Sequence, residues 1–144
     1  MSRPAAAVRV APRPLLGLAA FAAYIIVIIA VQGTSGVPVD ELGDSAGNLW
    51  RSGVLSIALA SAVVAGLATW WGWWRLALTE RVTTSRRWTI IAPALIAVHT
   101  VGTLLYTGWS DIGTDFIVAG VAVGLLVGFG EEFTTRGMLL VGLR

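Results

Sequence analysis

The sequence predicts an all-α, polytopic membrane protein with about four transmembrane helices, and three observations support this prediction. First, 56% of the residues are hydrophobic and only 12% are charged, whereas soluble domains carry roughly 25% charged residues. Second, the apolar residues gather in four runs, each near or above the roughly 20 residues that span a bilayer core. Third, tryptophans and charged residues collect near the ends of these runs, as they do at membrane interfaces.

The four apolar runs are expected to be helices, because an open sheet edge in lipid would leave backbone groups unpaired at several kcal/mol each. We predict a mobile cytoplasmic tail over residues 1–14 and a transmembrane helical domain over residues 15–144. The predicted spans are residues 15–31, 53–74, 88–106 and 116–143.

The first run could be either a secretory signal or a retained anchor. Arg3, Arg9 and Arg13 precede it, as basic residues precede the apolar core of a signal peptide. However, residues 15–31 exceed the roughly 7–15 residues of such a core, and no A-x-A cleavage site follows. We therefore expect a retained membrane anchor.

Arginine placement predicts the orientation. The arginines of the tail and the four in the loop of residues 75–87 fall on one side of the membrane, which the positive-inside rule makes cytoplasmic. Most acidic loop residues fall on the other side: Asp40, Glu41, Asp44, Asp111 and Asp115. Both termini are thus expected in the cytoplasm of a multi-pass cell-membrane protein, specifically one of a bacterial inner membrane.

Composition also limits the partners. All ten basic residues are arginines at the edges of apolar runs, and the formal net charge is only +2, so no nucleic-acid partner is predicted. The absence of cysteine excludes disulfides, thiolate ligands and cysteine nucleophiles. Lipid is the expected surrounding. Gly120 and Gly124 form a G-x-x-x-G pair that favours internal helix packing over a dimer face, which leaves the oligomeric state open.

Charged residues interrupt the fourth span. Glu131 lies roughly 22 Å along the helix from Phe116, which is the cytoplasmic third of a core about 30 Å thick. A carboxylate at the centre of such a helix costs about 2.5–3.5 kcal/mol, so these groups usually face a protein interior or a water cavity. The alternative is a helix that ends at Gly130, but residues 137–143 are apolar again, which argues against it.

The spacing of these charges separates the two acids. Glu132 and Arg136 are four residues apart and share one helix face, with the acid before the base. Glu131 points about 100° away from Glu132 and is unpaired within its own helix. We expect Glu132 and Arg136 to be paired support, and Glu131 to be the carboxylate available as a general base.

At Gly130, Glu131, Glu132, Arg136 and Gly137 the sequence resembles the first motif, E-E-x-x-x-R, of the CPBP family of intramembrane proteases, also called the CAAX protease and bacteriocin-processing family. The resemblance directly covers only about the last thirty residues. It implies a polytopic helical fold whose site opens toward the cytoplasm. It also implies an intramembrane endopeptidase in which Glu131 activates water against a peptide bond of a membrane-associated peptide or protein substrate.

The family has been described both as a metalloprotease and as a glutamate protease, so the resemblance leaves a metal open; the candidate is zinc, with Glu131 and Glu132 as ligands. Its two later motifs, F-x-x-x-H and H-x-x-x-N/D, are missing, because no His or Asn follows Arg136. We therefore expect the N-terminal part of a longer, here truncated, CPBP-like domain that is inactive alone. His99, the only histidine, precedes the motif, and we expect it to be buried and hydrogen-bonded rather than a ligand.

Two other functions stay open. The protein could be a non-catalytic membrane scaffold or partner-binding protein that uses the Glu-Glu-x-x-x-Arg helix for packing. It could also be a subunit of a proton-coupled transporter in which Glu131 is the protonatable group. The sequence does not select the substrate or the metal.

Overall fold

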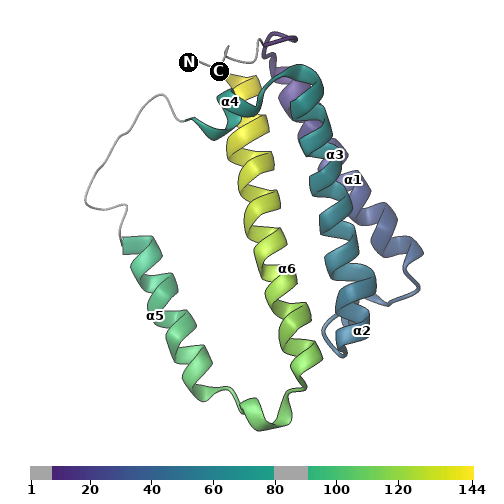
Figure 1. The fold of residues 1–144 in the computed structure, drawn as a ribbon, viewed down its shortest axis with the longest axis vertical. Helices are drawn as coiled ribbons and strands as arrows, with labels where there is room; N and C mark the ends of the chain where they lie inside the picture. The colour runs from purple at the N-terminus through teal and green to yellow at the C-terminus, as the bar shows by residue number, and fades with distance from the viewer. Residues whose placement is uncertain (1–7, 80–90) are drawn as a thin grey trace, which may run out of the picture. The chain divides into compact units, whose positions relative to one another are not determined.

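The computed structural model describes residues 8–79 and 91–144, and these two stretches contain helices, turns and no β-strand (Figure 1). Three helices among them are long and apolar enough to cross a membrane: Pro14–Thr34, Ala46–Trp71 and Thr114–Leu143. The predicted class is confirmed: the chain is an all-α, polytopic membrane protein.

The described residues fall into two compact units. The first comprises residues 8–79 and 114–144, and it holds all three long helices. The second holds α5 (Ile91–Tyr106) and the short 3₁₀ turn η4 (Trp109–Asp111). At 16 residues, α5 is shorter than the other three, and it corresponds to the predicted span of residues 88–106, of which residues 88–90 lie outside the described part of the chain.

The first long helix, α1 (Pro14–Thr34), begins with a proline, which suits a first helical turn because its nitrogen has no hydrogen to leave unpaired. It continues three residues beyond the predicted end at Val31. The Thr34 hydroxyl donates to the Ala30 carbonyl at 2.9 Å, and the Ser35 hydroxyl donates to the Gln32 carbonyl at 2.7 Å. These bonds occupy carbonyls that a helix end would otherwise leave free.

The second long helix begins earlier than predicted, after the 3₁₀ turn η1 (Val39–Glu41). It consists of α2 (Ala46–Asn48), the π-helical η2 (Leu49–Val54) and α3 (Leu55–Trp71). The Ser45 hydroxyl caps its start by accepting from the Asn48 N–H at 3.1 Å. Arg51, which precedes the predicted start at residue 53, lies inside this helix and donates to the Ser35 carbonyl at 3.1 Å.

The same helix also ends earlier than predicted, at Trp71 rather than Trp74. Gly72 adopts φ +73°, a left-handed conformation that favours glycine and ends helices. The short helix α4 (Trp74–Leu78) follows. The tryptophan cluster therefore lies at a corner between α3 and α4 rather than along one continuous helix.

Part of the predicted mobile tail is tied to this corner. The N–H groups of Arg9 and Val10 both donate to the Trp71 carbonyl, at 3.0 and 3.2 Å. The Trp73 indole N–H donates to the Val10 carbonyl at 2.7 Å. The Trp71 carbonyl is one of those that α3 cannot pair internally, so the tail caps the helix end. The prediction of a mobile tail is therefore wrong at Arg9 and Val10, which are held by hydrogen bonds. Residues 1–7 of the predicted tail lie outside the described part of the chain.

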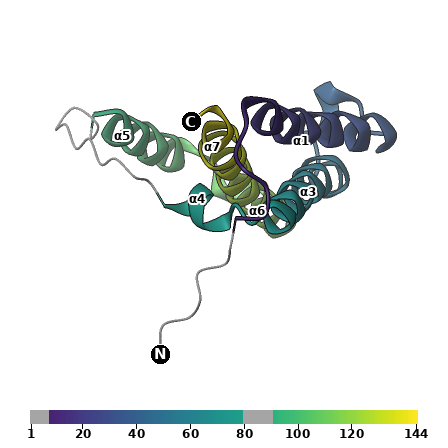
Figure 2. The ribbon, with the colours of Figure 1, turned by 90° about the horizontal axis from the view of Figure 1, so that it is seen from above.

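The last long helix runs through the charged stretch without a break. It consists of α6 (Thr114–Glu132), the π-helical η5 (Phe133–Leu139) and α7 (Leu140–Leu143), 30 residues in all. The predicted span of residues 116–143 is confirmed as one helix, and the alternative of a helix that ends at Gly130 is wrong. Figure 2 shows α1 lying against both α3 and this last helix.

Glycines set how closely α1 approaches the last helix. A Cβ atom added to Gly142 would lie 2.7 Å from the Cα of Gly17, so the two backbones touch. Gly120 and Gly124 have nothing within 4 Å of such an atom. The internal packing expected at that G-x-x-x-G pair is therefore not found within the first unit, where packing occurs instead at glycines that the spacing did not single out.

Candidate functional site

The Glu-Glu-x-x-x-Arg residues lie at the point where the last helix changes type. Glu131 and Glu132 end α6, and Arg136 lies in the π-helical η5. Both acidic residues are exposed, and the helix continues for more than two turns beyond them. Single π-helical turns occur frequently at functional sites, because they change the direction of side chains within a helix.

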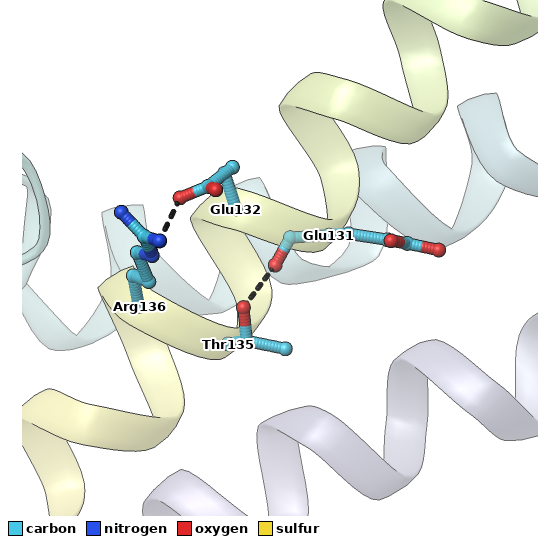
Figure 3. A network of polar contacts seen from close by, with 4 residues as sticks. All are labelled: Glu131, Glu132, Thr135 and Arg136. Atoms are coloured by element: carbon cyan, nitrogen blue, oxygen red, sulfur yellow. Dashed lines mark hydrogen bonds and ion pairs between the residues drawn. The ribbon is translucent and has the colours of Figure 1, made fainter. Parts of the chain in front are cut away.

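Glu132 and Arg136 form the predicted ion pair. The Arg136 Nε lies 3.1 Å from the Glu132 Oε2, and the two side chains are 76% and 60% exposed (Figure 3). The predicted contact between these two side chains is therefore confirmed.

Glu131 points away from this pair, as Figure 3 shows. Its carbonyl oxygen accepts a hydrogen bond of 2.6 Å from the Thr135 hydroxyl, which fixes the turn. Its side chain lines a partly open pocket of about 380 Å³ between α1 and the α6–η5 junction, and Glu132 reaches the same pocket. The other lining residues include Phe21, Tyr24, Ile25 and Thr134.

Two further hydroxyl groups approach the backbone beside Glu131. A Cβ atom added to Gly130 would lie 2.6 Å from the Ser61 Oγ and 2.7 Å from the Tyr24 hydroxyl. Glycine at this position thus lets α1 and α3 bring both hydroxyls against the last helix. The Tyr24 and Ser61 hydroxyls are therefore neighbours at Gly130.

Tyr24 and Ser61 were not predicted from the sequence as site residues. A signal for Tyr24 was present, since it is the only residue with a polar side chain between Leu15 and Val31. Tyrosines of membrane helices are enriched at the interfaces, so one in the middle of a span is unusual. Ser61 carried no comparable signal, because small residues are common throughout its helix.

His99 belongs to the second unit. It lies on α5 at an exposed position and lines an open pocket together with Gly102, Thr103 and Tyr106. The burial expected for this ring is therefore not found within its unit.

The acidic residues do not fit zinc, which needs three protein ligands even at a catalytic site. Among the described residues, no group of three or more His, Cys, Asp or Glu side chains comes together to hold a metal ion. Glu132 is already paired with Arg136, and Glu131 points elsewhere.

The two neighbouring carboxylates thus differ in what they can do. Glu132 is paired with Arg136, whereas Glu131 has no ion-pair partner among the described residues; both acids line the pocket next to α1. No match was found when the chain was compared with models of known families, with curated proteins and with solved structures.

Proposed function

We propose that this protein supplies the glutamate half of an intramembrane endopeptidase site of the CPBP type. One observation carries the proposal: Arg136 pairs with Glu132 at 3.1 Å, while Glu131, which lines the pocket next to α1, has no such partner among the described residues. A base must be able to accept a proton, and Glu131 is the acid left free to do so. Its resemblance to the E-E-x-x-x-R motif gives the reaction class.

In the proposed reaction, the Glu131 carboxylate takes a proton from a water molecule, and the water oxygen attacks the carbonyl carbon of a peptide bond. The carbon–nitrogen bond of the tetrahedral intermediate then breaks. The proton passes from Glu131 to the leaving amine, so the carboxylate is regenerated. In this reaction the paired Glu132 and Arg136 take no proton and have a supporting role beside Glu131.

The proposed site faces the cytoplasmic side of a bacterial inner membrane. Support comes from the arginines that precede α1 and follow α4 in the sequence, which the positive-inside rule places in the cytoplasm together with both termini. The substrate is a membrane-associated peptide or protein. The resemblance assigns the second half of the site to histidine motifs that this sequence lacks, so we expect no cleavage by the 144-residue chain alone.

The test uses the protein expressed in its own host with its whole natural reading frame, purified into lipid nanodiscs. Cleavage of fluorogenic membrane-anchored peptides, some with prenylated C-termini, is measured for the wild type, Glu131→Gln and Glu132→Gln. We expect Glu131→Gln to lower kcat by at least about 100-fold, and Glu132→Gln to lower it less. Unchanged turnover by Glu131→Gln, or strong proteolysis by the 144-residue chain, would contradict the proposal.

A second candidate is a subunit of a proton-coupled transporter. It is favoured by the hydroxyl groups beside Glu131, because chains of polar groups relay protons in membrane proteins. Proton flux into vesicles that contain the protein distinguishes the two functions. A transporter loses flux in Glu131→Gln and cleaves no peptide, whereas the proposed peptidase shows no flux in either form.

A further inference from the structure

We propose that the Tyr24 hydroxyl and the Glu131 carboxylate hold one ordered water molecule between them in the pocket next to α1. Tyr24 would then be a positioning residue for the water that Glu131 activates. This catalytic role depends on the function proposed above, whereas the water site itself does not.

The position of Tyr24 supports this proposal. Its side chain is only 4% exposed, yet it lines the pocket that Glu131 also lines. A phenol can donate one hydrogen bond and also accept one. Ser61, which lies behind the hydroxyl at Gly130, can satisfy only one of these two capacities. The other is left for a group inside the pocket.

One buried neighbour, Ser61, can attract this hydroxyl. The Ser61 Oγ is inaccessible to solvent, and it has no hydrogen-bond partner within the described part of the chain. A buried hydroxyl without a partner costs about 1–3 kcal/mol, so Ser61 gains by drawing the Tyr24 hydroxyl toward it. Gly130 leaves the space in which the two groups meet.

The pocket is large and polar enough for water. Its volume of about 380 Å³ is many times the roughly 30 Å³ that one water molecule occupies in the liquid. A buried water needs two to four polar partners. Tyr24 and Glu131 supply two from opposite walls, α1 and α6.

Glu131 also needs such a water. An ionised carboxylate within a membrane helix is tolerated when it is paired or hydrated. Among the residues that the structure describes, no cation pairs with Glu131, because the nearby guanidinium of Arg136 is held by Glu132. Hydration from the pocket is therefore the stabilising interaction that the geometry offers.

The first experiment detects the water without any activity. The chain has only two tyrosines, Tyr24 and Tyr106, so carbon-13 labelling of tyrosine gives few signals in solid-state NMR of the protein in lipid bilayers. We expect rapid transfer of magnetisation from water to the Tyr24 ring, slowed several-fold in Glu131→Leu. Asp115→Leu, at an exposed acid in the first turn of the same helix and outside the pocket, is the control and should leave the transfer unchanged.

Two results would overturn the water site. One is the absence of transfer from water to Tyr24 in wild-type bilayers, a result that needs no variant to fold. The other is equal transfer rates in the wild type and in Glu131→Leu.

The second experiment tests positioning in the protein expressed with its natural reading frame. Tyr24→Phe should lower kcat about tenfold and leave KM unchanged, since one hydrogen bond to the attacking water is lost. Tyr106→Phe makes the same chemical change on α5 and should leave both constants unchanged. A rise in KM with unchanged kcat would assign Tyr24 to substrate binding instead and would contradict the proposal.

The two experiments separate this inference from the proposed function. If water contacts Tyr24 but the natural protein cleaves no peptide, the water site stands and the peptidase proposal fails. If cleavage requires Glu131 but wild-type Tyr24 receives no transfer, the water site alone fails.

Discussion

The two halves of the helix of residues 114–143 use glycine in opposite ways. In the first half, a Cβ atom added to any of three glycines would have nothing within 4 Å; these are Gly120, Gly124 and Gly128. In the second half, an added Cβ would lie 2.6 Å from a side chain at Gly130 and 2.7 Å from a backbone at Gly142. The charged motif thus stands in the half that is packed, where α1 and α3 can hold it.

The largest expected effect comes from Gly142→Ala in the packed half. Its Cβ would lie 2.7 Å from both the Cα and the N of Gly17, and backbone atoms cannot rotate away. Overpacking of this kind costs typically 1–3 kcal/mol, and we expect the upper end, about 3 kcal/mol. Thermal unfolding in detergent, followed by circular dichroism, measures the loss.

Gly124→Ala in the open half is the matched control. The new methyl group meets no atom within 4 Å, and alanine favours helix over glycine by about 1 kcal/mol. We expect no loss of stability. Equal destabilisation by the two variants would show that the halves do not differ as described.

Gly130→Ala should have a smaller effect than Gly142→Ala. Its Cβ would approach the ends of two side chains, the Ser61 Oγ at 2.6 Å and the Tyr24 hydroxyl at 2.7 Å, which can move. We expect a loss of about 1–2 kcal/mol in the same unfolding measurement. Ser61→Ala combined with Gly130→Ala removes one of the clashing atoms, so the double variant should be more stable than additive losses predict. Strict additivity would contradict this contact.

Contacts between residues close together in the sequence could be predicted, whereas contacts between distant segments could not. The pairing of Glu132 with Arg136 follows from a spacing of four residues on any helix, so it was predictable. Tyr24 lies more than a hundred residues before Glu131, and the pocket that they share lies between α1 and the last helix, whose backbones touch at Gly17 and Gly142. A G-x-x-x-G spacing could not identify that crossing, since the glycines that pack lack it.

The exact ends of the second long helix also depend on contacts with distant segments, so they could not be predicted from the sequence. A hydropathy pattern predicted that the second span would begin after Arg51, but an acceptor from another segment, the Ser35 carbonyl, allows this arginine inside the helix. Its end was placed at Trp74, because apolar residues continue to that point. The left-handed Gly72 stops it at Trp71, and the tail residue Val10 accepts from Trp73. Apolar character therefore located the helix, whereas polar contacts decided its limits.

Trp73→Phe tests this corner and should have a moderate effect. It keeps an aromatic ring at a fully buried position but removes the indole N–H that donates to the Val10 carbonyl at 2.7 Å. We expect a loss of about 1 kcal/mol, the contribution of one hydrogen bond, in the same unfolding measurement. Trp70→Phe is the control, because Trp70 is 67% exposed. A variant Trp73→Phe as stable as Trp70→Phe would mean that the tail contributes nothing to the corner.

The ion pair of the motif should contribute least to stability, although it is the most conspicuous polar contact of the site. Both side chains are more than half exposed, at 60% for Glu132 and 76% for Arg136. Exposed pairs at this helix spacing contribute about 0.3–0.5 kcal/mol and are screened by salt. The coupling energy from Glu132→Gln, Arg136→Gln and the double variant, measured by unfolding at low and high salt, should fall in that range and decrease with salt. A salt-independent coupling well above about 1 kcal/mol would show that the pair is shielded from water, and both carboxylates, rather than Glu131 alone, would then face the protein interior.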